Sequence, residues 1–285
     1  MNGTVNRANI LGVSWMINAA FTLSVMILIV NHLANVHSFI IFATSSLIAA
    51  ICSACYIIFT KKSFKVKRIY GYLLRALFGS VSMVMWFHTV KSIPVTEATS
   101  ISFLTPLLNS LCAILILKES FSYKNFLSLI VGFIGAIIML QPMFVNFNYG
   151  YFLALVTVII WVITDLLTKI QARTDETIIQ CFYISLFTFL FCLPFAISVW
   201  QNLNANEIKW LIILGLFQFF NLYSLFKAYS YANLSLIVPF DFTRLIFTAI
   251  FAYFILGETV SLNSYFGAII ILISVIYLGR NSIKS

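Results

Sequence analysis

Two residues of opposite charge, Asp241 and Arg244, interrupt an apolar stretch that is long enough to cross a membrane, Leu234 to Leu256. At about 1.5 Å per helical residue, Asp241 lies roughly 10 Å and Arg244 roughly 15 Å from Leu234, close to the middle of a hydrocarbon core. Spaced i and i+3, they share a helix face and can neutralise one another. Charges at this depth usually mark a substrate or ion pathway, and an ion pair kept only for structure is the alternative interpretation.

Pro239 precedes this pair by two residues. Proline has no backbone N–H, so it leaves a carbonyl of the preceding turn without its helical partner. Discontinuous helices of this kind occur at the binding sites of transporters. The stretch is therefore predicted to contain an interrupted helix.

A related stretch, Pro94 to Ser120, lies 139 residues earlier in the chain. Aligning Glu119 with Glu258 fixes the offset, and each glutamate stands just past the end of its apolar run. The same offset aligns three polar positions: Ser102 with Asp241, Thr105 with Arg244, and Asn109 with Thr248. The chain is therefore predicted to contain an internal duplication.

Small and polar residues at helical spacing form stripes along several predicted helices. Such a stripe faces protein or water and not lipid, so it either packs helices together or lines a cavity. The stripes are Gly79, Ser82 and Trp86; Thr99, Ser102, Pro106, Asn109 and Ala113; Gln218, Asn221 and Leu225; and Asp241, Arg244 and Thr248. The sequence is compatible with both interpretations.

The composition identifies an integral membrane protein of the all-α class. The 285 residues are 62% hydrophobic and only 9% charged, which is too apolar for a soluble domain. Continuous apolar runs exclude a transmembrane barrel, because apolar and polar residues alternate along the strands of a barrel. Ten membrane-spanning helices are predicted, approximately Asn9–Val30, His37–Phe59, Tyr70–Val90, Thr96–Leu117, Lys124–Gln141, Tyr149–Ile170, Thr177–Val199, Lys209–Ser230, Leu234–Leu256 and Leu262–Gly279.

The basic residues predict the orientation of these helices. With a cytoplasmic N-terminus, one side carries twelve Lys and Arg residues and the opposite side only Lys91 and Lys209. The positive-inside rule then places both termini in the cytoplasm. The basic residues that produce the net charge of +9 lie mostly in the connections between spans. The cluster from Lys61 to Arg68 is therefore expected to contact anionic lipid and not nucleic acid.

The duplication divides the chain into residues 1–145 and 146–285, five helices each. Because five is odd, the second half is predicted to insert upside down relative to the first. The first apolar run lacks a small-residue cleavage site, so we expect it to be retained. Glycines at positions 132, 135 and 267 suit close helix packing.

The remaining charged residues near membrane depth are expected close to the cytoplasmic surface. Arg75 and Lys227 would extend their side chains to it, and Asp165 would pair with Lys169 at i, i+4. Glu119 and Glu258 oppose the helix dipole at a C-terminus, which local propensity does not explain.

No motif for catalysis or ATP hydrolysis is present, so we expect no enzyme, metal or cofactor. Cys52 and Cys55 form a C-x-x-C without further ligands and are expected to pack within a span.

The chain resembles the EamA-type carriers of the drug/metabolite transporter superfamily over essentially its whole length. The residues that carry this resemblance are Arg75-Ala76-Leu77, Pro94-Val95-Thr96, Ala98-Thr99, Ser102-Phe103, Pro106 and the two helix-end glutamates. Within the superfamily, PVTEAT and LFKAYSYANLSLIVPF through AYFILGE resemble the S-adenosylmethionine uptake transporters of intracellular bacteria.

This resemblance implies a secondary transporter of the bacterial cytoplasmic membrane that moves a small metabolite by alternating access, with the lipid bilayer as its other partner. S-adenosylmethionine uptake, in exchange for S-adenosylhomocysteine or by facilitated diffusion, is the first expectation. Export of amino acids or other small metabolites is an alternative, and a non-transporting scaffold is a second. The candidate substrate-binding residues are Asp241, Arg244, Trp86, Ser102, Asn109, Thr248, Asn221 and Trp15.

Overall fold

The computed structural model describes residues 2–120, 122–141, 148–256 and 262–284, and every regular element in these ranges is a helix. In chain order the helices are α1 (Asn2–His32), α2 (Ser38–Phe59), α3 (Ile69–Ser92), α4 (Val95–Ser102), α5 (Leu104–Leu115), α6 (Tyr123–Leu140), α7 (Tyr149–Gln171), α8 (Thr177–Ser198), α9 (Ala205–Tyr231), α10 (Leu234–Ile237), the 3₁₀ helix η1 (Val238–Phe242), α11 (Thr243–Leu256) and α12 (Leu262–Lys284).

Nine apolar spans in the described residues are long enough to cross a membrane, and Leu262–Leu278 forms a shorter apolar helix. Each of the ten stretches expected from the sequence corresponds to one helix or to one interrupted helix. The expected multi-pass helical architecture is therefore confirmed for the described part of the chain.

Two of these spans are interrupted, one in each half of the chain. In the first half, α4 ends at Ser102 and α5 begins at Leu104, two residues before Pro106. In the second half, Pro239 lies in η1, between α10 and α11. The interruption predicted from Pro239 is therefore present, and it takes the form of a tighter 3₁₀ turn.

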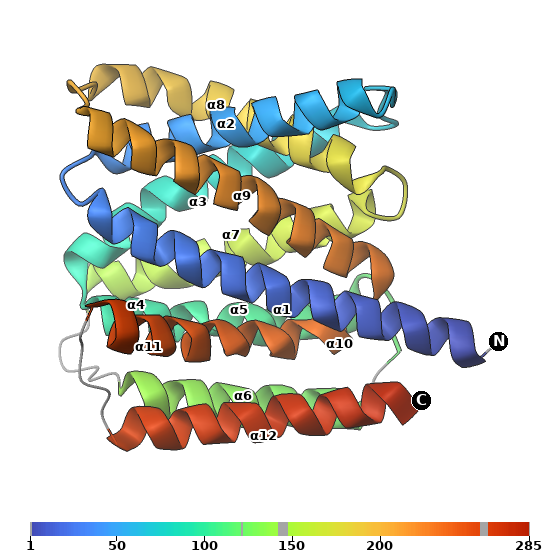
Figure 1. The fold of residues 1–285 in the computed structure, drawn as a ribbon. Helices are drawn as coiled ribbons and strands as arrows, with labels where there is room; N and C mark the ends of the chain where they lie inside the picture. The colour runs from blue at the N-terminus through green and yellow to red at the C-terminus, as the bar shows by residue number, and fades with distance from the viewer. Residues whose placement is uncertain (1, 121, 142–147, 257–261, 285) are drawn as a thin grey trace.

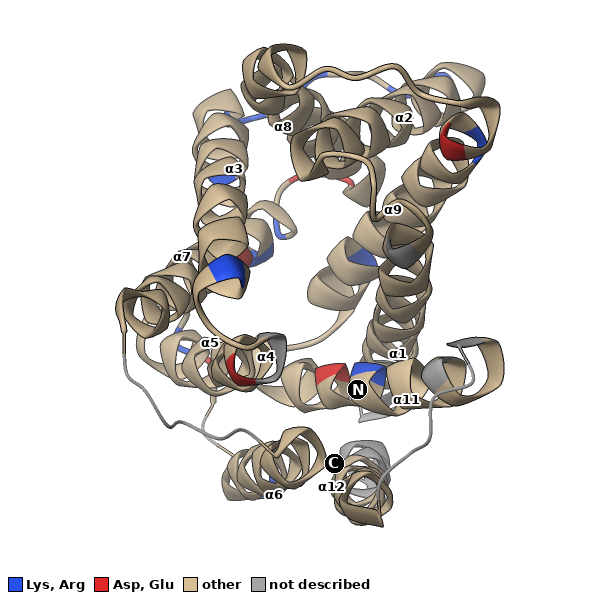
Figure 2. Cartoon of the chain, turned by 90° about the vertical axis from the view of Figure 1, so that its left-hand side faces the viewer, with Lys and Arg blue, Asp and Glu red and all other residues tan. Residues whose placement is uncertain are grey.

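The helices run along a common direction, and both termini lie at the same end of the bundle, called here the termini end (Figure 1). The loop from residue 60 to residue 68 and the α7–α8 loop lie at this end too. Figure 2 looks onto the opposite end and shows α6 and α12 side by side, below the other helices. The most extensive helix contacts are those of α1 with α9, α2 with α8, α6 with α12, and α3 with α7.

Glycines allow α6 to approach its neighbours closely. A Cβ atom on Gly267 of α12 would lie 2.6 Å from the carbonyl oxygen of Gly135, and one on Gly132 would lie 2.8 Å from the Phe242 ring. Both distances are shorter than a van der Waals contact. The packing role expected for these three glycines is therefore confirmed.

We expect Gly267→Ala to destabilise the protein, because the new Cβ atom would meet backbone atoms of Gly135 and Met139 that cannot move aside. Overpacking of this kind typically lowers stability by about 1–3 kcal/mol, which corresponds to a fall of about 5 °C in the unfolding midpoint. Thermal unfolding of the detergent-solubilised protein measures this. Gly79→Ala is the matched control, since a Cβ atom there would meet nothing within 4 Å; equal midpoints for both variants would contradict the prediction.

Candidate functional site

Asp165 of α7 lies where four other helical segments bring polar groups together. The Asn109 side-chain amide of α5 donates to the Asp165 carboxylate at 2.7 Å. The Tyr229 hydroxyl of α9 also approaches this carboxylate, and Arg75 and Asp241 are close enough to interact with it electrostatically. We call the four charged residues Arg75, Asp165, Asp241 and Arg244 the central charge cluster.

Asp241 and Arg244 pair with one another as predicted, but loosely. The Arg244 Nε atom lies 3.6 Å from Asp241 Oδ2, longer than a good charged hydrogen bond. The two side chains keep 20% and 22% of their surface exposed. The guanidinium also lies over the Phe103 ring, with Cζ 4.4 Å from the ring centroid. The pair is thus open enough to exchange its partners for those of a ligand.

Arg75 points into the protein, so the expectation that it extends to the surface is wrong. Its Nε atom donates to the Thr168 hydroxyl at 2.7 Å, and its Cζ atom lies 5.3 Å from the Phe226 ring centroid. A guanidinium can be kept at this depth because a hydroxyl, an aromatic face and the nearby Asp165 carboxylate replace water around it.

Asp165 and Lys169 do not form the surface pair expected from their spacing. The Lys169 ammonium donates to the backbone carbonyls of Tyr229, at 2.7 Å, and Ala232. These carbonyls lie at the C-terminal end of α9, where no further helical N–H can reach them. Each side chain thus finds an unsatisfied partner on another helix, and the buried Lys169 stabilises a helix end.

Glu119 has a role that its own helix does not explain. Its carboxylate accepts hydrogen bonds from the backbone N–H groups of Leu234 and Ser235, at 2.9 and 3.0 Å, and from the Ser235 hydroxyl at 2.9 Å. It therefore caps α10, in the other half of the chain. Lys118, with a left-handed φ of 55°, turns the chain so that Glu119 can reach α10. Glu258, its counterpart by sequence, lies outside the described residues.

The other residues expected in the site are either aromatic or polar, and they contact partners outside the central charge cluster. Two are aromatic: Trp86 packs on Trp161, with ring centroids 5.0 Å apart, and Trp15 packs on Tyr223 at 5.7 Å. Three are polar and hydrogen-bond within or between helices. Ser102 donates to Thr99 O, Asn221 to Ala19 O, and Thr248 to Ser24 Oγ. Of the expected set, the structure brings Asn109 and Asp241 close to Asp165, and Arg244 close to Asp241.

Arg75 and Asp165 belong to the central charge cluster, and Tyr229 contacts it through Asp165; all three were missing from the expected site. A signal was available for the two charged residues, because each stands several residues inside an apolar span. Nothing in the sequence distinguishes Tyr229 from the other tyrosines.

Three polar contacts hold the loops at the termini end in place. Lys62 forms an ion pair with Glu176, the Tyr72 hydroxyl donates to Asp175 at 2.7 Å, and the Tyr183 hydroxyl donates to the Phe64 carbonyl at 2.8 Å. The hydrogen bond to Glu176 raises the pKa of Lys62. The ion pair joins the loop of residues 60–68 to the α7–α8 loop, whereas the two tyrosines attach the α7–α8 loop to α3 and the loop of residues 60–68 to α8.

The model of the EamA-like transporter family matches residues 10–141 and 148–280. The chain belongs to the EamA-like transporter family. It is 28% identical over 279 residues to the S-adenosylmethionine uptake transporter of Rickettsia prowazekii (strain Madrid E), a match that covers 96% of this chain and 95% of that one. It is 24% identical to the riboflavin transporter of Vibrio cholerae serotype O1, over 76% of this chain and 74% of that one.

A solved crystal structure shares the fold. It superimposes with a TM-score of 0.81, at 17% sequence identity, over 95% of this chain and 98% of that one. At this identity the comparison establishes the fold alone. The helical arrangement of this chain is therefore one already seen in a crystal structure.

We expect Glu119→Gln to destabilise the protein, because the amide would remove the charge that caps α10 and would place donors against N–H groups. Hydrogen bonds to a charged group contribute about 1.5–3 kcal/mol, so the unfolding midpoint should fall by about 5 °C. Glu207→Gln is the matched control: Glu207 also caps a helix N-terminus, with Asn204, but at an exposed site. If the two variants unfold at the same temperature, the buried cap has no special role.

Proposed function

We propose that this protein is a secondary transporter that takes up S-adenosylmethionine across the bacterial cytoplasmic membrane by alternating access. Its two halves, residues 1–145 and 146–285, form inverted five-helix repeats with both termini in the cytoplasm. Membership of a transporter family and the Rickettsia relative support this proposal. The central charge cluster is the observation that carries it.

The pattern of helix contacts supports the inverted repeat. Under the sequence offset, α1 corresponds to α7 and α3 to α9. The contact of α1 with α9 then corresponds to that of α7 with α3, and the contact of α2 with α9 to that of α8 with α3. In Figure 1, α1 starts at the termini end, whereas α7 starts at the opposite end. Equivalent helices thus run in opposite directions, as inversion requires.

The chemistry of the cluster favours S-adenosylmethionine over riboflavin. S-adenosylmethionine carries a sulfonium, an ammonium and a carboxylate, and its adenine ring is aromatic. Asp165 and Asp241 can face the two cationic groups and Arg244 the carboxylate, while Phe103 and the Trp86–Trp161 pair offer aromatic faces. Riboflavin is uncharged and would leave the four charged side chains without ligand partners, which is unfavourable at membrane depth.

We expect Asp241→Asn and Arg244→Gln each to lower the initial rate of S-adenosylmethionine uptake at least tenfold, because each loses a charged contact worth about 1.5–3 kcal/mol. The assay is uptake of radiolabelled substrate by bacterial cells that do not otherwise import it. Membrane levels of each variant are measured in parallel.

The charge-exchanged double variant, Asp241→Arg with Arg244→Asp, tests the purely structural alternative. This variant keeps an ion pair but reverses its direction. If the pair binds substrate, uptake should stay low, and if the pair is only structural, uptake should recover. Recovered uptake would therefore remove these two residues from the site. Uptake absent in the unsubstituted protein but accompanied by accelerated efflux of amino acids would favour the exporter, and neither activity would favour a scaffold.

Alternating access also requires the termini end to open, and the Lys62–Glu176 ion pair opposes this. We expect Lys62→Glu to speed alkylation of a cysteine placed at Asn109 by a reagent added at the termini end. The effect should not exceed about fivefold, since an exposed pair contributes at most about 1 kcal/mol. Adding Glu176→Lys should restore the original rate. A double variant that stays as reactive as the single one would contradict this role of the pair.

A further inference from the structure

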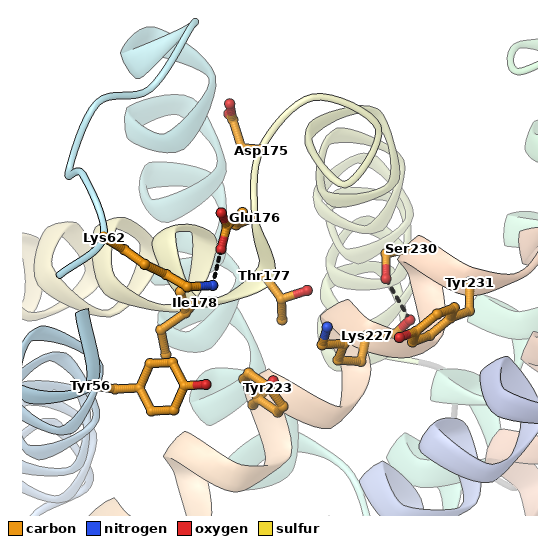
Figure 3. A pocket seen from close by; sticks show the side chains of 10 residues that line it. All are labelled: Tyr56, Lys62, Asp175, Glu176, Thr177, Ile178, Tyr223, Lys227, Ser230 and Tyr231. Atoms are coloured by element: carbon orange, nitrogen blue, oxygen red, sulfur yellow. Dashed lines mark hydrogen bonds and ion pairs between the residues drawn. The ribbon is translucent and has the colours of Figure 1, made fainter. Parts of the chain in front are cut away.

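A second pocket, separate from the central charge cluster, opens at the termini end (Figure 3). It has a volume of about 420 Å³, within the range of small-ligand sites. Its walls are the last turn of α2, the two loops that carry Lys62 and Asp175–Glu176, the start of α8 and the last turns of α9. Three tyrosines line it, Tyr56, Tyr223 and Tyr231.

Lys227 is the charged residue of this pocket that lacks a carboxylate partner. Its Nζ atom lies 5.7 Å from the Tyr223 ring centroid and 5.5 Å from that of Tyr231. The two acidic residues of the pocket are already engaged, Glu176 with Lys62 and Asp175 with the Tyr72 hydroxyl. Among the described residues Lys227 forms no ion pair. The pocket therefore presents an ammonium between aromatic faces, which suits a ligand with an anionic group and a planar ring.

The pocket and the central charge cluster share the C-terminal turns of α9. One face of the helix presents Phe226 to Arg75 and Tyr229 to Asp165, while Lys227 and Tyr231 line the pocket. Tyr223 also lines the pocket, and its ring contacts Trp15 of α1 at 5.7 Å. A ligand in the pocket would thus lie one helix away from the cluster.

Resting on the proposed function, we propose that this pocket is a second binding site for the transported S-adenosyl compound, filled from the termini end. The Lys227 ammonium binds the carboxylate of the ligand, and the rings of Tyr223 and Tyr231 contact its adenine. The site accepts both S-adenosylmethionine and S-adenosylhomocysteine, because the two share a carboxylate and an adenine. Only S-adenosylmethionine carries a sulfonium, and this group is recognised by the central charge cluster and not by the pocket.

Occupancy of the pocket can be measured locally with a cysteine at Ser230→Cys, in a protein whose five native cysteines are replaced. Ser230 lines the pocket and is exposed. S-adenosylhomocysteine should slow alkylation of this cysteine. Lys227→Gln should raise the half-protecting concentration about tenfold, since a charged contact is lost, and Lys227→Arg should raise it far less. Decarboxylated S-adenosylmethionine lacks the carboxylate that Lys227 would bind. In the protein with Lys227 intact it should protect the cysteine only as poorly as S-adenosylhomocysteine protects it in Lys227→Gln.

Two control variants test whether this protection arises in the pocket itself. Lys209→Gln should leave protection unchanged: Lys209 also lies over an aromatic ring of α9, 6.0 Å from the Trp210 centroid, but near the opposite end of the helix. Asp241→Asn should also leave protection intact, because it alters the central charge cluster alone.

Loss of this protection in Asp241→Asn would overturn the proposal of a second site, and so would protection that is unchanged in Lys227→Gln. Neither result would contradict transport by the protein. Absence of S-adenosylmethionine uptake by the unsubstituted protein would instead overturn the proposed function, and this assignment of the ligand with it.

Discussion

The structure depends on satisfying the backbone groups that α9 and α10 expose where one helix ends and the next begins. Buried N–H and C=O groups at such a junction have no water to bind, so each must find a partner within the protein. Where α9 gives way to α10, the Lys169 ammonium binds carbonyls at the end of α9 and the Glu119 carboxylate binds N–H groups at the start of α10. The junction is thus held between two charges of opposite sign, each matched to the helix end that it contacts.

The rest of the candidate site follows from this junction. With the start of α10 held by Glu119, the 3₁₀ turn buries Phe240 and Phe242, and Phe242 stacks on Phe103 at 5.3 Å. The next turn then carries the Arg244 guanidinium over the Phe103 ring. Because Phe103 belongs to the first half and Arg244 to the second, the site forms only when both halves are in place.

The spans, the interruption at Pro239 and the glycine contacts could be predicted from the sequence, because each depends on local chemistry: apolar length, a missing N–H and a missing side chain. The partners of the buried charges could not. The spacing of Asp165 and Lys169 shows that they share a helix face, but not that one meets an amide of α5 and the other the carbonyls of α9. For Glu119 the relevant helix begins 115 residues further along the chain, beyond the reach of any local rule.

The charges of the cluster also bear on how an empty carrier could change conformation. Two aspartates and two arginines sum to zero, so the cluster without ligand carries no net charge through the membrane. The loose contact of 3.6 Å between Asp241 and Arg244 can be replaced by a ligand that brings an ammonium to one and a carboxylate to the other. Because the internal pair reforms when such a ligand leaves, we infer that the empty protein can return without a coupling ion. Facilitated diffusion fits this arrangement, as does exchange when substrate is present on both sides, since neither requires a group that binds a proton or a sodium ion at each turnover.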